Sequence, residues 1–378
     1  MQIAIVLYDG NVGGAEKVTA ELAGALRQSG VEATVVFVRD PKTLAADLDR
    51  LHVPYVTFGA TRVEEVLWRP RRFARLVAAH ARDGALLPAV GHQAPALRIG
   101  GYRGPIVAME HGFLLMMDAM APGWRLARRI ERGLSAPFVD VEVAVSDFML
   151  ERVLRLRAEP RAVRIYNGVS VDSRPYLSCE ATQDGIVTFA HAARLIEGKG
   201  TDTLIEAFAQ SEARHSSRLI IAGDGPERRR LEGLAQSRGV RERVSFAGVV
   251  ADMIDFWGAC DVAVLPSSTF VESFGMVAVE AMSLGKPVIA TRNGGVPEVL
   301  GDDAGIVVEP GDPAGLSRAL DRYAADRDLR LEHGGRGRRR CEEMFSIEGC
   351  AETFGRLFAE LGGGTLPARA PTLEHVHA

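Results

Sequence analysis

Short apolar runs alternate with longer amphipathic helical patterns along nearly the whole chain, and this alternation is the strongest constraint on its fold. The runs with strand composition span residues 3–8, 33–38, 105–110, 142–146, 185–193, 217–225, 243–250, 260–266 and 286–291. Apolar strands that alternate with amphipathic helices predict parallel sheets covered by helices on both faces. The series breaks once, at the polar, proline-containing stretch 171–185, and then restarts.

We therefore predict an α/β protein with two doubly wound, Rossmann-like domains. The predicted parts are residues 1–172, a linker at 173–184, residues 185–345, a final helix at 346–361 and a flexible tail at 362–378. Ligands of doubly wound sheets bind at the carboxyl ends of the strands. A chain with two such domains is expected to hold its site in the cleft between them.

Composition excludes several classes of protein. A net charge of −4 gives no sign of a nucleic-acid partner. The four cysteines lack the spacing of a metal site, and no apolar stretch is long enough to span a bilayer. Because the sequence opens directly on a strand pattern, we expect no signal peptide and a cytoplasmic location.

Two glycine-containing turns follow predicted strands. Gly13 and Gly14 precede the first helix, where backbone amides favour an anion, although the spacing is not that of a dinucleotide fingerprint. Gly223 and Asp224 end a strand of the second domain. Both turns are also explained by structure alone, so the ligand interpretation depends on what lies beside them.

Two cations, Arg194 and Lys199, lie in the loop after the strand at 185–193. At the mouth of a parallel sheet they could neutralise a diphosphate without a metal. Lys199 is the more informative of the two, because only four of the 45 basic residues are lysines.

Two glutamates, Glu272 and Glu280, are eight positions apart, and Glu280 interrupts an apolar helical run. A carboxylate there is costly unless it is bound, and it could accept two hydrogen bonds from a vicinal diol such as ribose. Glu272 precedes amides that have no partner within the helix and that could hold a phosphate or a sugar. These are the amides of Phe274, Gly275, Met276 and Val277. The alternative for Glu280 is a buried pair with a protein arginine.

The motifs "VAVSDF", "IYNGVSVD", "RLIEGKGTDTLIEAF", "AGDGPERRRLE", "FAGVV", "DVAVLPSSTFVESFGMVAVEAMSLGKPVIAT" and "GGVPEV" follow one another in this order. Together they resemble the retaining nucleotide-sugar glycosyltransferases of family 4, whose fold, called GT-B, has two Rossmann-like domains. The resemblance implies that the last helix crosses back to the first domain. It also implies that the first domain binds the acceptor.

The resemblance implies a role for each candidate residue. Gly14 and its neighbours would pack against the donor diphosphate and the acceptor. Arg194 and Lys199 would hold the diphosphate as it leaves. Glu272 would grip the transferred sugar, and Glu280 the ribose. His111, which follows the strand at 105–110, would contact the sugar near the reacting carbon. A hexose would pass from a nucleotide diphosphate to an acceptor hydroxyl with retention, and without a metal or other cofactor.

Three other functions stay open from the sequence. A sugar-nucleotide 2-epimerase shares this fold and would need no acceptor. A dinucleotide-dependent oxidoreductase is disfavoured by the missing fingerprint. A binding protein without activity requires that the cleft residues be idle. The acceptor could be a lipid-linked sugar, a glycan or a small molecule.

Two arginine-rich stretches, 69–83 and 123–134, carry apolar residues at helical spacing. Basic amphipathic helices bind anionic lipid surfaces, which would place the enzyme on the inner face of the cytoplasmic membrane. The alternative is that both are ordinary helices whose apolar sides face the core.

Overall fold

The computed structural model describes residues 1–10, 14–118, 120–156, 161–171, 174–177 and 185–362. Contacts divide the chain into two compact units, and each is described here by itself. Unit 1 is Met1–Gly168 with the segment from Ser346 onward, and unit 2 is Val169–Phe345.

Unit 1 contains one seven-stranded parallel sheet in the order β3-β2-β1-β4-β5-β6-β7. Its strands are β1 (Gln2–Leu7), β2 (Glu32–Phe37), β3 (Tyr55–Thr57), β4 (Gly84–Leu87), β5 (Ile106–Glu110), β6 (Val141–Ala144) and β7 (Arg161–Arg164). Its α-helices are α1 (Gly14–Gln28), α2 (Leu44–Arg50), α3 (Glu65–Trp68), α4 (Pro70–Ala78), α5 (Gln93–Ile99), α6 (Phe113–Asp118), α7 (Pro122–Ser135), α8 (Asp147–Arg155) and α16 (Ile347–Leu361). A 3-10 turn, η1 (Ala136–Phe138), follows α7.

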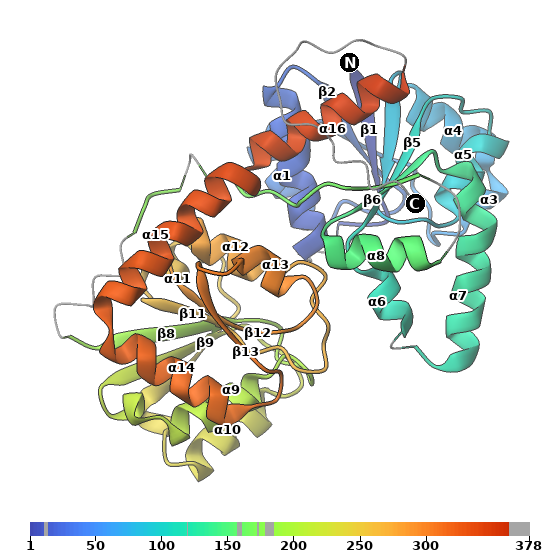
Figure 1. The fold of residues 1–378 in the computed structure, drawn as a ribbon. Helices are drawn as coiled ribbons and strands as arrows, with labels where there is room; N and C mark the ends of the chain where they lie inside the picture. The colour runs from blue at the N-terminus through green and yellow to red at the C-terminus, as the bar shows by residue number, and fades with distance from the viewer. Residues whose placement is uncertain (11–13, 119, 157–160, 172–173, 178–184, 363–378) are drawn as a thin grey trace. The chain divides into compact units, whose positions relative to one another are not determined.

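Helices cover both faces of this sheet, as Figure 1 shows. On one face, α3, α4 and α5 pack on alternate residues of β1, β2, β4 and β5. On the other face, α1 lies against α16. The α16 helix belongs to unit 1 although it follows unit 2 in the sequence. The α16 helix begins at Ser346, whose side chain accepts a hydrogen bond from the amide of Gly349, and buries Phe354 and Phe358. The last helix therefore crosses back to the first unit, as predicted.

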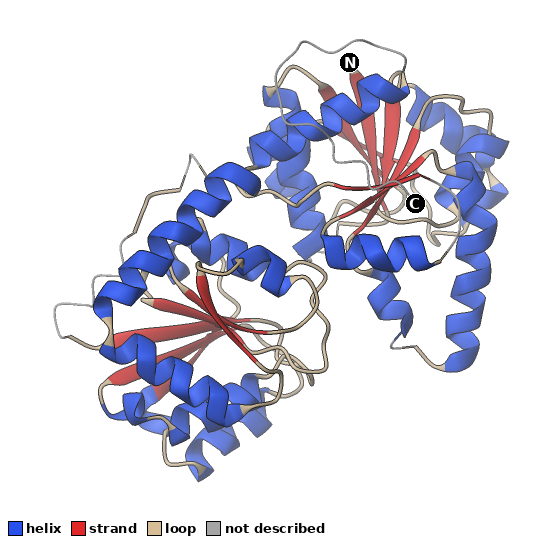
Figure 2. Ribbon diagram, viewed as in Figure 1, coloured by secondary structure: helices blue, strands red, loops and turns tan. Residues whose placement is uncertain are grey.

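Unit 2 contains a six-stranded parallel sheet in the order β10-β9-β8-β11-β12-β13, drawn in red in Figure 2. Its strands are β8 (Val187–Ala192), β9 (Ser217–Ala222), β10 (Val244–Gly248), β11 (Val262–Leu265), β12 (Val288–Thr291) and β13 (Gly305–Val308). Its α-helices are α9 (Thr201–Gln210), α10 (Arg228–Ser237), α11 (Met253–Gly258), α12 (Met276–Met282), α13 (Val296–Leu300), α14 (Pro313–Ala325) and α15 (Arg327–Met344). Two 3-10 turns are η2 (Glu212–His215) and η3 (Arg241–Arg243).

Apolar side chains of α9, α10 and α14 form the core on one face of this sheet. The α12 helix packs on β11, on α13 and on α15. Strand order in both sheets reverses beside the first strand, between β1 and β4 in unit 1 and between β8 and β11 in unit 2. These two places are where doubly wound sheets bind ligands.

The fold class predicted from the sequence is confirmed, with two parallel sheets flanked by helices. Four strands were not predicted: β3, β4, β7 and β13. The predicted domain boundaries stay a prediction. The division by contacts falls at Gly168/Val169, and most of the predicted linker and nearly all of the predicted tail lie outside the described residues.

Candidate functional site

The loops that follow β8 and β11 come together where strand order reverses in unit 2. Lys199, from the first loop, places its Nζ 2.7 Å from Oε1 of Glu272, from the second. The Ser267 hydroxyl donates to the same oxygen over 2.6 Å. Lys199 also lies over the Phe270 ring, 3.6 Å from its centroid. Two predicted site residues therefore form one charged pair, with the side chains 14% and 18% exposed.

Backbone contacts hold these two loops together. The Ser268 amide donates to the carbonyl of Gly198 over 2.8 Å. Gly200 has φ 71°, and a Cβ at this position would lie 1.8 Å from the carbonyl oxygen of Pro266. Only glycine permits that approach. The Asn293 amide nitrogen donates to three carbonyls of the second loop, including that of Phe270 over 3.1 Å.

His191, near the end of β8, links the elements that carry this site. Sequence reasoning missed this residue. Its Nδ1 lies 2.9 Å from the Val264 carbonyl, so Nδ1 donates, and Nε2 accepts from the Thr201 hydroxyl over 3.1 Å. Burial lowers the pKa of His191 to about 4. A neutral imidazole therefore ties β8 to β11 and to the start of α9.

Glu280 lies in α12, half-buried, one turn beyond the amides predicted to bind the donor. Arg174 and Ser283 both contact its backbone carbonyl, with Nη1 of Arg174 at 3.5 Å and Oγ of Ser283 at 2.7 Å. Its carboxylate has no hydrogen bond or ion pair with any residue that the structure describes. The alternative of a pair with a protein arginine is therefore not found there.

The first turn of α12 presents the predicted amides. Gly275 precedes the helix with φ 98°, and no side chain caps it. Amides at the first turn of a helix have no partner within it. The Phe274 side chain is buried and its ring packs edge-on against Phe345, so any donor contact from Phe274 must come from its backbone. Met276 and Val277 are half-buried.

The remaining predicted residues of unit 2 lie on the same edge of the sheet. Arg194 is exposed after β8, and its guanidinium has no ion pair within the described part of the chain. Gly223 has φ 116°, and a Cβ there would lie 1.8 Å from the Ala193 carbonyl, which gives this glycine a structural reason of its own. The exposed Asp224 carboxylate lies 3.8 Å from Arg228.

In unit 1, the glycine turn after β1 is only partly described. Gly13 lies outside the described residues. The Gly10 amide donates to the Asp40 carbonyl over 2.8 Å, and a Cβ on Gly10 would overlap the Pro41 carbonyl, so this glycine serves the turn itself. Gly14 is exposed at the start of α1, and a Cβ there would meet no atom within 4 Å.

His111 follows β5 and is half-buried. Desolvation lowers its pKa to about 4, so the ring is neutral at neutral pH. The preceding residue shapes its loop: Oε1 of Glu110 accepts the amides of Gly112 at 2.8 Å and Leu114 at 3.2 Å. The contact of His111 with the donor sugar stays a prediction.

Glu110 also belongs to a buried charged cluster that sequence reasoning missed. Arg132 of α7 is paired with Glu142 of β6, and its Nη1 lies 4.0 Å from Oε2 of Glu110. All three side chains are almost fully buried. Burial, followed by the nearby charge of Glu142, raises the pKa of Glu110 to about 7. The signal in the sequence was an acidic residue at the end of an apolar strand.

A second polar cluster lies where strand order reverses in unit 1. The Tyr8 hydroxyl donates to Oε1 of Gln93 over 3.0 Å, and burial raises the Tyr8 pKa to about 12. Nδ1 of the neighbouring His92 lies 3.0 Å from Glu131 of α7. This pair, together with Arg128, lowers the pKa of Glu131 to about 2.

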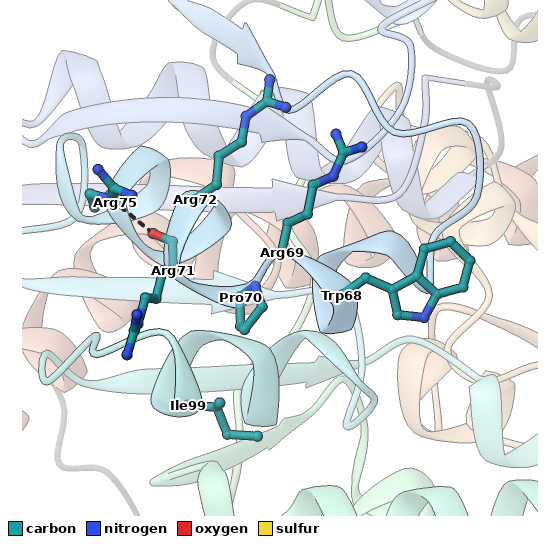
Figure 3. A pocket seen from close by; sticks show the side chains of 7 residues that line it. All are labelled: Trp68, Arg69, Pro70, Arg71, Arg72, Arg75 and Ile99. Atoms are coloured by element: carbon teal, nitrogen blue, oxygen red, sulfur yellow. Dashed lines mark hydrogen bonds between the residues drawn. The ribbon is translucent and has the colours of Figure 1, made fainter.

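A hollow of about 540 Å³ lies elsewhere, on α3 to α5. Figure 3 shows that the guanidinium groups of Arg69 and Arg72 point to one side of α4 and that of Arg71 to the other, so they do not converge on one ligand. Phe73 and Val77 of this helix are fully buried. The apolar side of the arginine-rich stretch 69–83 therefore faces the core, which is the stated alternative to a membrane-bound helix.

The described residues contain no group of three or more histidine, cysteine, aspartate or glutamate side chains placed to hold a metal ion. None of their helices combines the length and the apolar character that a membrane span requires.

Comparison with known proteins places the chain in a family. Residues 12–173 match the family described as Glycosyltransferase Family 4, and residues 181–340 match the one described as Glycosyl transferases group 1. The lipopolysaccharide core biosynthesis glycosyltransferase LpsE of Rhizobium meliloti is 30% identical over 365 residues, which cover 93% of this chain and 97% of LpsE. LpsD of the same organism is 27% identical over 377 residues, or 93% and 96% of the two chains.

Solved structures agree in fold. Anabaena HepE in complex with UDP superposes with a TM-score of 0.81 at 22% identity, over 95% of this chain and all of the other. HepE has also been determined in complex with UDP-glucose, with a TM-score of 0.79, and covers 95% of this chain and 99% of that one. The two family matches and the likeness to LpsE along almost its whole length establish that the chain is a glycosyltransferase of family 4.

Proposed function

We propose that this glycosyltransferase moves a hexose from a nucleotide diphosphate to an acceptor hydroxyl, with retention at the anomeric carbon and without a metal. The observation that carries the proposal is the charged pair of Lys199 and Glu272, together with a Glu280 carboxylate that pairs with none of the described residues. One cation and two carboxylates therefore follow strands β8 and β11 of one sheet. A nucleotide sugar presents a diphosphate, which a cation binds, and hydroxyls of a hexose and of a ribose, which donate hydrogen bonds to carboxylates.

Each side chain has a proposed task. Lys199, with Arg194, binds the diphosphate and stabilises the charge that develops on it as it leaves. Glu272 accepts hydrogen bonds from hexose hydroxyls, aided by the amides at Phe274 and Gly275. Glu280 accepts hydrogen bonds from the two ribose hydroxyls, which its negative charge strengthens.

Retention follows from a displacement on one face of the sugar. The bond from the anomeric carbon to the diphosphate oxygen breaks, and the bond to the acceptor oxygen forms on the same face. The acceptor proton passes to an oxygen of the departing phosphate. The protein supplies positioning and positive potential, which are the main sources of rate in such a step. His111, neutral at pH 7, is proposed to hold the sugar near the reacting carbon.

Relatives support a nucleotide sugar as the donor, and they bear on which class of acceptor the enzyme uses. HepE was determined with UDP and with UDP-glucose. A Corynebacterium glutamicum relative, 34% identical over 185 residues, is a GDP-mannose-dependent mannosyltransferase of a phosphatidylinositol mannoside. We propose an acceptor that is a lipid-linked sugar, a glycan or a small molecule of bacterial polysaccharide, glycolipid or natural-product synthesis. The reaction would take place in the cytoplasm, with unit 1 in peripheral contact with an anionic membrane.

Turnover of labelled nucleotide sugars tests the proposal. The enzyme is incubated with UDP- and GDP-hexoses, with and without an extract of glycolipids and with simple sugar acceptors. Acceptor-dependent release of nucleotide diphosphate with an α-linked product from an α-linked donor is expected. Isomerisation of the donor without an acceptor would instead identify a 2-epimerase. A β-linked product would refute retention.

A further inference from the structure

The α7 helix of unit 1 exposes a row of large apolar side chains. Leu126, Ile130 and Leu134 are 59%, 53% and 68% exposed, and their spacing of four residues places them on one face of the helix. Trp124, in the first turn, is 70% exposed. We call Leu126, Ile130 and Leu134 the apolar row.

The opposite face of α7 carries charge and points into the protein. Arg132 is buried and forms an ion pair with Glu142. Glu131 is hydrogen-bonded to Nδ1 of His92 over 3.0 Å. Arg128 also belongs to this face, where it forms an ion pair with Glu131. An amphipathic helix of a globular protein normally turns its apolar face to the core. In α7 the polarity is reversed.

The buried pair keeps the helix in this orientation. Turning α7 by half a revolution would bury the apolar row, but it would also remove Arg132 from Glu142 and Glu110. Two buried carboxylates would then share a site without a cation, which is strongly unfavourable. The exposure of the apolar row is therefore set by the interior contacts of the helix, and the row is available to a partner.

The charges beside the row show which partner fits. Arg129 is exposed on the outward side, and Arg125 donates to the backbone carbonyls of Asp118 and Met120 and pairs with no carboxylate among the described residues. Glu131 is the one acidic residue of α7, and it faces inward. An apolar row with arginines alongside, no outward carboxylate and a tryptophan at one end is suited to the interface of an anionic bilayer.

We propose that α7 is a lipid-docking helix, which lies on an anionic bilayer with Leu126, Ile130 and Leu134 inserted among the acyl chains and its arginines at the headgroups. This inference deepens the peripheral contact of the proposed function, and it does not depend on the donor chemistry. Because Arg132 joins α7 to Glu110, the docked helix is continuous with the loop that carries His111. A lipid-linked acceptor would then be met at the bilayer surface by the acceptor-binding unit.

Vesicle flotation tests the proposal, with phosphatidylcholine vesicles that contain phosphatidylglycerol. The wild-type protein is expected to float with these vesicles, to stay behind with pure phosphatidylcholine, and to be released by salt. The triple variant Leu126→Ser, Ile130→Ser, Leu134→Ser should lose at least about tenfold in partitioning, because three inserted side chains are removed. The control is Val249→Ser, which changes an apolar residue of unit 2 that is 81% exposed.

Two further measurements locate the contact. Arg129→Gln should weaken binding and reduce its dependence on salt. Trp124→Phe should abolish the blue shift of tryptophan fluorescence on vesicle binding, whereas Trp68→Phe should retain it.

Several outcomes would overturn the proposal. Flotation of the triple variant at the wild-type level would show that α7 is not the contact. A lipid-free wild-type dimer that the triple variant converts to a monomer would assign the row to a second copy of the chain. Titration of the same variants with UDP keeps the two proposals separate: retained nucleotide binding in a variant that no longer floats leaves the donor site standing.

Discussion

The Nζ atom of Lys199 lies 2.7 Å from Oε1 of Glu272, across two loops that are separated by more than seventy residues of sequence. The pair joins the proposed diphosphate ligand to the proposed sugar ligand. Each residue therefore holds the other in position, and neither can be replaced without disturbing both.

Replacing Lys199 with alanine is expected to reduce turnover by about 10²–10³, the cost of losing one preorganised donor to a developing charge. The double variant Lys199→Ala, Glu272→Gln should lose less than the product of the single losses, because the residues form one unit. Steady-state rates of the three variants check this. Strictly multiplicative losses would contradict a shared function.

Glu280→Gln is expected to weaken binding of the nucleotide diphosphate by at least about tenfold. Hydrogen bonds to a charged acceptor contribute roughly 1.5–3 kcal/mol, and an amide replaces only part of this. Calorimetric titration measures the change. Glu212→Gln, which alters a carboxylate that is 84% exposed after α9, is the matched control. Equal affinity in wild type and Glu280→Gln would remove Glu280 from the ribose site.

Full activity in EDTA is expected of the wild-type enzyme. Arg194, Lys199 and the amides before α12 supply the positive potential that a divalent ion provides in other transferases. Rates are compared after exhaustive chelation and after addition of manganese or magnesium. A loss in EDTA that manganese restores would overturn the proposed assignment of the diphosphate site.

Unfolding of unit 1 is expected to depend on pH through Glu110. Its folded pKa is about 7, above the ordinary value of 4.5, so the folded state binds the proton more tightly than the unfolded state. The stability it contributes is present below about pH 4.5 and is lost as pH rises to 7, by about 3 kcal/mol in all.

Glu110→Gln should remove this part of the pH dependence, because the amide oxygen still accepts the amides of Gly112 and Leu114 while the titrating group is gone. Urea unfolding of wild type and variant at pH 5 and pH 8 measures the difference. The same change in stability for both proteins would assign the titration to another group.

Gly200→Ala is expected to destabilise unit 2 far more than Gly239→Ala. Both glycines have a positive φ, 71° and 73°, which costs alanine about 1 kcal/mol. A Cβ on Gly239 meets no atom within 4 Å, whereas one on Gly200 would collide with the Pro266 carbonyl. Thermal unfolding of the pair isolates the collision, and equal shifts would show that the two loops can separate.

The sequence was sufficient for the fold class because strands that are buried on both faces are continuously apolar. Three of the missed strands lack a sequence pattern that identifies a strand. β3 has three residues, only half-buried or exposed, and β7 has an arginine at each end of two apolar residues, so neither presents an apolar run. β4, "GALL", is fully buried, but four residues are too few to distinguish a strand from a helix turn.

The candidate site was predictable where loops follow strands, since the carboxyl ends of parallel strands share one edge. The partners of each residue were not. The residues next to Glu110 and Glu142 in the sequence do not indicate that Arg132 is their shared cation, because that contact depends on how α7 packs. The reversed polarity of α7 has the same origin: periodicity shows two faces of a helix but not which of them is turned inward.

The return of the chain through α16 has a consequence for biosynthesis. Unit 2 is one continuous segment, whereas unit 1 is completed only by residues that follow it. The Phe358 ring fits against Gly84 so closely that a Cβ on that glycine would lie 2.3 Å from it, so the sheet of unit 1 has an open apolar face until α16 arrives. Domains usually fold in order from the N-terminus on the ribosome. Here the second unit can finish first, and the nascent first unit depends on the last helix, or on a chaperone, to cover its sheet.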